Sequence, residues 1–206
     1  MTYTEILDAV VSLTNREDMA AEIQIAIQAS TLRVHQSDYY SRDVTEDTIT
    51  LAGTDYLHSI SIQAMFPRFR AVKYLRKWDP TGIDPISGLP TGLAGAFFDV
   101  LDPEAIMDTY GVNKENIYYV TGGALQLRSS TQISSLLAGW YQSPKISPVG
   151  QFSSWIAEVV PHAIIFDACS IIFQMVAQQE QSRKFDALVA EQMSLVRMHG
   201  LIGKGY

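Results

Sequence analysis

Cysteine is almost absent from this sequence, because Cys169 is the single cysteine among 206 residues. One cysteine cannot form a disulfide within the chain or supply a cysteine-based zinc site. It lies in the apolar run Ala168-Cys169-Ser170-Ile171, where cysteine behaves as a small hydrophobic side chain rather than as an activated nucleophile. We therefore expect no disulfide framework and a reducing site of assembly.

Long basic runs are also missing. Asp and Glu number 22 against 15 Lys and Arg, which gives a formal net charge of -7. A surface that holds nucleic acid by neutralising its phosphates is therefore not visible. An acidic protein can still line a path through which DNA slides, because charge repulsion keeps the polymer from sticking there.

One local basic cluster is interspersed with aromatic residues and lies in a predicted strand. Two interpretations are open, a stacking surface for single-stranded nucleic acid and a solvated strand that carries cations against aggregation. We favour the second. The residues are Arg68, Phe69, Arg70, Lys73, Tyr74, Arg76, Lys77 and Trp78.

No stretch is long and apolar enough to predict a membrane span. The most apolar segment, Val159 to Ala177, is interrupted by Pro161 and Asp167 and is expected to be a buried helix. Met1 to Asp8 lacks a basic region followed by an apolar one, which argues against a secretory signal. We expect no membrane partner.

Residues with catalytic or metal-binding potential are scattered. None of His35, His58, His162 and His199 belongs to a metal-binding helical motif. A cluster of His162 with Glu158 and Asp167 on one helix is conceivable, but a hydrogen-bonded histidine is the simpler interpretation. The two glycine-rich phosphate-binding motifs, GxxxxGKS and GxGxxG, do not occur in the sequence.

Four carboxylates gather around a predicted short helix and are the strongest candidates for general acid–base chemistry. They are Asp99, Asp102, Glu104 and Asp108. Acids that complement the helix dipole explain most of this arrangement. We expect no catalytic, cofactor-binding or metal-binding residues, and therefore not an enzyme. A hydrolase that uses these carboxylates is the remote alternative.

The two ends of the chain carry helical patterns. Thr2 and Glu5 have the spacing of a capping box, and helices are predicted over about 3–38, the second of them capped by Asn15. Ser154 is expected to cap further helices over about 154–199, with a kink at Pro161.

The middle of the chain, about 44–142, has the alternating pattern of strands. Strands are expected to include Ile60, Ile62 and Ala64, and Phe69 to Trp78, with a turn at Gly122-Gly123. A short helix from Asp102 to Gly111 and a long loop from Asp79 to Gly95 are also predicted. The expected fold is a single α+β domain, a helical bundle from both termini with a central antiparallel β insertion.

The last residues, 200–206, form a glycine-rich tail that is too short to fold alone. A frayed terminus and a segment that orders on a partner are both open interpretations. In the second, Leu201, Ile202 and Tyr206 insert into the partner's surface.

The order of several segments resembles that of the head-to-tail adaptor proteins of short-tailed bacteriophages. The segments that carry the resemblance are Leu13-Thr14-Asn15-Arg16, Asp38 to Asp43, Arg68 to Arg76, Tyr110-Gly111, Ile117 to Gly122, Leu125 to Ser129, Trp140-Tyr141 and Ser154-Trp155-Ile156. None of them has a chemistry of its own, so the resemblance depends on their order along most of the chain.

The resemblance implies a structural protein of the virion neck, a connector without an active site. It implies a homo-oligomeric ring, twelve-fold in the family, between the portal protein and the tail nozzle or tail fibre proteins. Viral DNA would pass through the ring without sequence-specific binding. It also implies that Leu201, Ile202 and Tyr206 reach into the portal. Another minor virion protein, such as a head-completion or tail protein, is the alternative.

Overall fold

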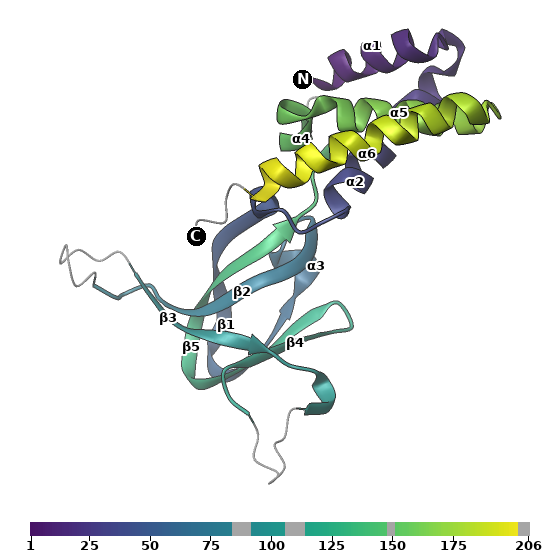
Figure 1. Cartoon of the computed structure of the whole chain (residues 1–206). Helices are drawn as coiled ribbons and strands as arrows, with labels where there is room; N and C mark the ends of the chain where they lie inside the picture. The colour runs from purple at the N-terminus through teal and green to yellow at the C-terminus, as the bar shows by residue number, and fades with distance from the viewer. Residues whose placement is uncertain (84–91, 106–113, 148–150, 202–206) are drawn as a thin grey trace. The chain divides into compact units, whose positions relative to one another are not determined.

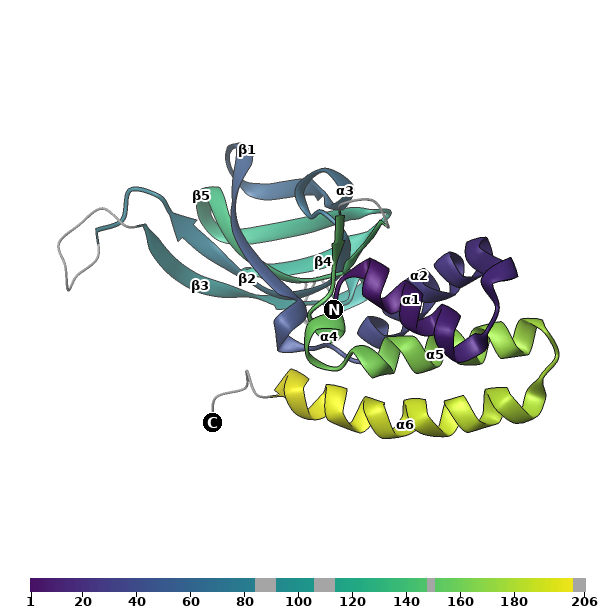
Figure 2. The same ribbon diagram turned by 90° about the horizontal axis from the view of Figure 1, so that it is seen from above.

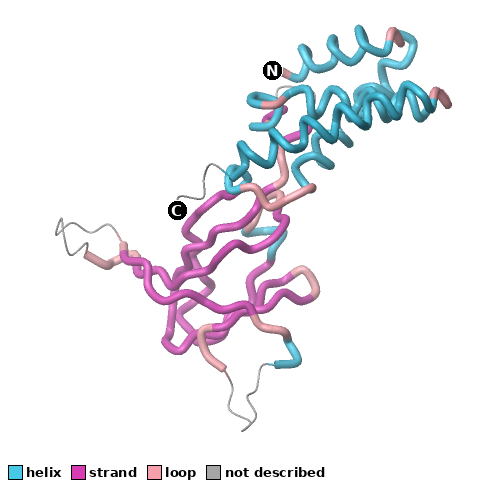
Figure 3. Tube along the Cα trace, viewed as in Figure 1, coloured by secondary structure: helices cyan, strands magenta, loops and turns pink. Residues whose placement is uncertain are grey.

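The computed structural model describes residues 1–83, 92–105, 114–147 and 151–201. The chain divides into two compact units, each treated separately below. The helical unit comprises Met1–Asp43 with Ser143–Tyr206, and the barrel unit comprises Val44–Gln142. Figure 3 distinguishes the helices of the first from the strands of the second.

The helical unit is built from five α-helices, two short 3-10 helices and a two-stranded ribbon (Figure 1). Its elements are α1 (Tyr3–Thr14), η1 (Glu17–Met19), α2 (Ala20–Gln36), η2 (Ser41–Asp43), β6 (Lys145–Ser147), β7 (Gln151–Ser153), α4 (Trp155–Val159), α5 (Pro161–Met175) and α6 (Gln179–Leu201).

Helix α1 begins at the predicted capping box. The Glu5 N–H donates to Thr2 Oγ1 at 3.3 Å, and the Thr2 N–H donates to Glu5 Oε2 at 2.7 Å, which confirms the motif. The role predicted for Asn15 was wrong. Asn15 ends α1 in the left-handed conformation, with φ 50°, and its N–H donates to the Val11 carbonyl.

The core of the helical unit consists mainly of aliphatic side chains from α1, α2, α4 and α5, with Val196 from α6. Figure 2 shows α5 and α6 side by side. The Phe173 and Phe185 rings stack between them, with centroids 5.5 Å apart. The apolar stripe of each helix is thus buried, the arrangement that makes short helices stable in water.

Pro161 separates two helices instead of kinking one, so this prediction was wrong. Val160 leaves the helical conformation, with φ -134°, and Pro161 begins α5. The first helical position suits proline, because a helix has no acceptor for a backbone N–H there. Ser154 caps α4 as predicted, since Ser154 Oγ accepts from the Ala157 N–H at 3.2 Å.

The barrel unit contains five strands, one four-residue α-helix and one 3-10 helix. They are β1 (Val44–Ser61), α3 (Ile62–Met65), β2 (Phe69–Asp79), β3 (Leu93–Val100), η3 (Pro103–Ala105), β4 (Ile117–Thr121) and β5 (Ala124–Gln142).

Strand β5 organises the sheet because it is long enough to pair with three other strands. On one edge it pairs with β1 along most of its length. On the other edge its first residues pair with β4 and its last residues with β2. Since β2 pairs with β3, and β3 with β4, the strands β5, β2, β3 and β4 close into a barrel (Figure 1).

The inside of the barrel is filled by large apolar side chains. Leu75, Leu125 and Leu136 are completely buried, and Trp140 packs edge-to-face on Phe66. The hairpin predicted at Gly122-Gly123 is confirmed. Both glycines have positive φ, and they join β4 to β5.

The expected architecture, a helical bundle with a central antiparallel β insertion, was wrong. The described residues form an α+β protein with six α-helices, in which the strands close a four-stranded barrel of their own, and β3 runs parallel to β4. The alternation of apolar and polar residues gave wrong strand boundaries, because irregularities in the strand pairing interrupt the pattern. Strand β1 changes register between Thr50 and Leu57, which hides one 18-residue strand behind two short patterns.

Two smaller predictions in this region also need correction. Ile62 and Ala64 belong to helix α3, which is capped by Ser61, and not to a strand. The helix expected from Asp102 begins as the 3-10 turn Pro103–Ala105, and its remainder lies outside the described residues. Residues 84–91 of the predicted loop lie outside them as well, and its last three residues, Leu93 to Gly95, belong to strand β3 and not to a loop.

Candidate functional site

The carboxylates that suggested acid–base chemistry do not lie in a cleft. Asp99, Asp102 and Glu104 are exposed to solvent, and Asp108 lies outside the described residues. Within the ranges that the structure describes, no three His, Cys, Asp or Glu side chains are grouped so that they could hold a metal ion.

The histidine cluster considered on α5 does not form. His162 packs against the Phe166 ring with centroids 5.3 Å apart, while Asp167 pairs with Arg33 at 2.9 Å. Cys169 is fully buried in the helical core, and burial raises the pKa of its thiol from 9.0 to about 12. Its thiolate, the nucleophilic form, is therefore scarce at neutral pH.

The basic cluster of β2 makes several hydrogen bonds within the barrel unit. Lys77 Nζ donates to Ser130 Oγ at 2.7 Å and to Thr131 Oγ1 at 3.1 Å. Arg76 donates to the Gly95 carbonyl and lies 4.3 Å from the centroid of the Phe97 ring. These two cations stabilise the pairing of β2 with its neighbours, which favours the structural interpretation of the cluster.

The structure brings together three residues that the sequence gave no reason to connect. His35 Nδ1 lies 2.8 Å from Asp43 Oδ1, and His35 Nε2 lies 2.9 Å from Ser154 Oγ. A neutral His35 with its proton on Nδ1 satisfies both contacts, because it donates to Asp43 and accepts from the Ser154 hydroxyl. This is the order of groups found in a serine hydrolase.

The surroundings of this serine–histidine–aspartate network favour a structural role. The three side chains are buried, with Ser154 3%, His35 1% and Asp43 7% exposed. Ser154 Oγ already accepts from the Ala157 N–H, and the Glu158 N–H donates to the Ser154 carbonyl. Ser154 Oγ is therefore engaged as the N-cap of α4 and as the partner of His35, which is a structural use of this hydroxyl.

The same network connects α4 with two segments, α2 and η2, that lie more than 100 residues earlier in the sequence. Asp43 Oδ1 also accepts from Trp155 Nε1 at 2.8 Å, so η2, α2 and α4 meet at one carboxylate oxygen. The Trp155 ring is in edge contact with Tyr40 and His35. We interpret the network as the polar centre of the helical unit, because the side chains of His35, Asp43 and Ser154 all have hydrogen-bond partners within it.

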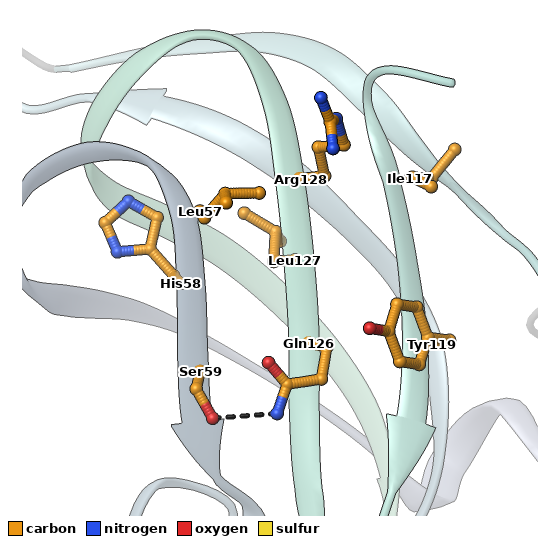
Figure 4. A pocket seen from close by; sticks show the side chains of 8 residues that line it. All are labelled: Leu57, His58, Ser59, Ile117, Tyr119, Gln126, Leu127 and Arg128. Carbon is orange, nitrogen blue, oxygen red and sulfur yellow. Dashed lines mark hydrogen bonds between the residues drawn. The ribbon is translucent and has the colours of Figure 1, made fainter. Parts of the chain in front are cut away.

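A pocket of about 290 Å³ lies on the barrel unit, lined by residues of β1, β5 and β4 (Figure 4). The strand register aligns Leu57, Arg128 and Ile117 in one row across these strands, and Ser59, Gln126 and Tyr119 in the next. Successive side chains of a strand point to opposite faces. Because Leu125 and Leu127 face the core, Gln126 and Arg128 face outward.

Arg128 is the one charged residue that lines this pocket. Its side chain is half-buried, and it makes no hydrogen bond or ion pair with any part of the chain that the structure describes. Beside it, Gln126 Nε2 donates to Ser59 Oγ at 2.8 Å, the bond drawn in Figure 4. None of the Arg128 nitrogens is among the buried side-chain atoms without a hydrogen-bond partner in the described residues, so its guanidinium is open to solvent at the edge of this pocket.

Large apolar side chains are exposed on both units. The highest exposures are 71% for Val100, 60% for Ile25 and 59% for both Leu57 and Ile83. Others on the barrel unit include Tyr56, Met65, Leu93, Phe97 and Val120, and on the helical unit Leu13, Tyr39, Met175 and Met198. Single apolar side chains are common on protein surfaces, and those that group together are candidates for contact with a partner.

The candidate portal-binding residues fall at the end of what the structure describes. Ile202 and Tyr206 lie outside the described residues, and so does the side chain of Leu201. The preceding Gly200 packs against the Tyr40 ring, and its carbonyl accepts from Ser41 Oγ at 2.9 Å. No helix among the described residues has the length and apolar character needed to cross a membrane.

Sequence reasoning missed the buried network and the Arg128 pocket. The network joins residues 119 positions apart, which no spacing rule connects. One signal was present, since His35 directly follows Val34 on the apolar face of α2. For Arg128 the signal was the alternating order Leu125, Gln126, Leu127, Arg128. If the two leucines face the core of the sheet, the glutamine and the arginine face outward.

No protein-family model matches the chain, and no curated protein matches it. Its function is therefore inferred from its own residues and from the resemblance in segment order described above.

Proposed function

We propose that this chain is a structural assembly protein, a ring-forming adaptor that links the portal of a short-tailed phage to its tail nozzle. The observation that carries the proposal is the exposure of large apolar side chains on both units, with Val100 and Ile25 as the extreme cases. A protein that works through many contacts with neighbours offers them apolar and aromatic side chains of this kind.

The chemistry of the buried groups supports the same role. Ser154, His35 and Asp43 hydrogen bond to one another inside the helical unit, and the Cys169 thiol is buried with a raised pKa. These groups stabilise the unit. In this proposal the chain therefore acts through its surface residues and not through these buried groups.

The charge of the chain fits a protein that surrounds a DNA channel. Its net charge of -7 repels the phosphate backbone and lets DNA pass without adhering. In this proposal the Leu201, Ile202 and Tyr206 side chains insert into the portal. The ring has twelve copies, as the resemblance implies.

Cryo-electron microscopy and native mass spectrometry of the chain, mixed with the portal protein of the same virus, test the proposal. We expect a ring of adaptor copies bound to the portal, and loss of binding when the chain is truncated after Met198. A chain that stays monomeric and does not bind the portal contradicts the proposal. Crosslinking to a different virion protein supports the alternative of a head-completion or tail protein.

A further inference from the structure

We propose that Gly200, through its contacts with Tyr40 and Ser41, positions the residues that follow it for binding to the portal. The inference rests on the proposed function and deepens it, because it names residues that direct the segment beginning at Leu201. It starts from an attachment within the helical unit. The Gly200 carbonyl accepts from Ser41 Oγ at 2.9 Å, across 159 positions of the sequence.

A glycine in the last turn of α6 needs a physical reason, because glycine weakens a helix relative to alanine. A left-handed helix end is not the reason, since α6 continues through Leu201 and Gly200 does not have a positive φ. The neighbouring Tyr40 ring supplies it. A Cβ added to Gly200 would overlap Tyr40 Cδ1 and lie 2.9 Å from Cε1. Glycine therefore lets this ring pack directly on the backbone of α6.

The Tyr40 ring is held in place by its other contacts. It is 3% exposed, and its hydroxyl lies 2.8 Å from Ser37 Oγ. The ring is in edge contact with Trp155, with centroids 5.3 Å apart, and Trp155 Nε1 donates to Asp43 Oδ1. The ring cannot move aside without breaking these contacts. The end of α6 is thus attached to the buried polar network of the helical unit.

Ser41 completes the attachment. The last carbonyls of an α-helix have no donor within the helix, and the Ser41 hydroxyl supplies one for Gly200. Gly200 directly precedes Leu201, the first of the residues proposed to insert into the portal. A fixed starting point limits the positions and directions that these residues sample before they bind. Binding then loses less conformational entropy, so the attachment strengthens it without contacting the portal.

Portal affinity of the full chain tests this role. We would measure binding to the portal protein of the same virus by biolayer interferometry. The chains are the wild type, Gly200→Ala, Ser41→Ala, Tyr40→Ala, the double variant Gly200→Ala with Tyr40→Ala, and the truncation after Met198. Ser194→Ala is the matched control, because Ser194 is exposed on the same helix and its hydroxyl donates to the Glu191 carbonyl. Circular dichroism and thermal unfolding check that each variant is folded.

We expect Gly200→Ala to weaken portal binding about tenfold, although alanine favours the helix more than glycine does. Ser41→Ala should weaken it about threefold, and Ser194→Ala less than about twofold. Tyr40→Ala should also weaken binding about tenfold, because the end of α6 is then no longer held.

The double variant separates positioning from direct contact with the portal. Since the clash at position 200 requires the Tyr40 ring, Gly200→Ala should cause no further loss once Tyr40→Ala has removed the ring. A glycine that contacts the portal itself would instead give two losses that multiply. Ser41→Ala, which removes a single hydroxyl, still tests the attachment if Tyr40→Ala does not fold.

Three outcomes overturn the inference. If folded Gly200→Ala and Ser41→Ala bind as the wild type does, while truncation after Met198 abolishes binding, the positioning role is wrong and the proposed function stands. If the losses from Gly200→Ala and Tyr40→Ala multiply, Gly200 does not act through the ring. If the truncated chain binds the portal as the wild type does, the positioning role and the proposed role of the C-terminal residues fail together.

Discussion

The polar network of the helical unit and Arg128 of the barrel unit differ in burial and in hydrogen bonding. In the helical unit His35, Asp43 and Ser154 are buried and satisfy one another. In the barrel unit Arg128 is partly exposed and makes no hydrogen bond or ion pair within the described residues, and the apolar Leu57 lies beside it, exposed. The first arrangement stabilises a fold, and the second leaves side chains accessible for contacts. Substitutions in this network should therefore affect stability, and those on the barrel face association.

The largest effect is expected for Asp43→Ala. This change leaves the His35 and Trp155 N–H groups buried without an acceptor, so the free energy of unfolding should fall by about 3 kcal/mol. Urea denaturation measures it. Asp43→Asn, which keeps one acceptor oxygen, should cost less, and Asp47→Ala on exposed β1 should change stability by less than about 0.5 kcal/mol. Equal losses for Asp43→Ala and Asp47→Ala would show that the network does not stabilise the unit.

Ser154→Ala should lower the free energy of unfolding by about 2 kcal/mol, because it removes both the cap of α4 and the partner of His35. Ser153→Ala, an exposed neighbour, is the matched control. A fluorophosphonate probe should leave Ser154 unmodified in the folded protein, as mass spectrometry can determine. An adduct on Ser154 would instead identify an accessible nucleophile.

Alkaline pH should destabilise the fold through Cys169. Its pKa is raised from 9.0 to about 12, so the unfolded chain loses this proton first as the pH rises above 9. Stability from the neutral thiol is thus fully present below pH 9 and falls by about 1.4 kcal/mol per pH unit between pH 9 and 12. At pH 10 the wild type should lose this amount relative to Cys169→Ala, as compared with pH 8. Parallel urea curves for the two proteins at both pH values would exclude the effect.

The smallest effect on stability is expected at the exposed face of the barrel unit. Val100→Ser should change the free energy of unfolding by less than about 0.5 kcal/mol, because Val100 is 71% exposed. The same substitution at Val10, which is buried in the helical unit, should cost about 3 kcal/mol. Val100→Ser should nevertheless weaken self-association. If it lowers stability as much as Val10→Ser does, the contrast between the units is wrong.

Local signals in the sequence predicted the local structure well. The capping box at Thr2, the cap at Ser154 and the turn at Gly122-Gly123 each depend on a few adjacent residues, and all three are confirmed. Asn15 shows the limit of such signals. It suits either end of a helix, and its left-handed φ became evident only in the structure.

The architecture and the candidate sites depend on pairing between distant residues, which alternation and spacing do not encode. The register change between Thr50 and Leu57 broke the pattern of β1, and nothing in the sequence indicated that β5 pairs with both β2 and β4. Likewise, the contact of His35 with Ser154 arises only after the helices have packed. Tertiary packing, rather than local preference, decided these features.

The late position of β5 in the chain also has a consequence for the order of events on the ribosome. Among the described strands, β1 pairs with β5 alone, and its first residue, Val44, pairs with Tyr141. At synthesis rates of about 5–20 residues per second, Val44 waits roughly 5 to 20 seconds for its partner. The helical unit waits as well, because its second half begins at Ser143. Until β5 has emerged, β1 therefore has no strand partner among the described strands, and formation of the sheet must follow synthesis of the barrel unit.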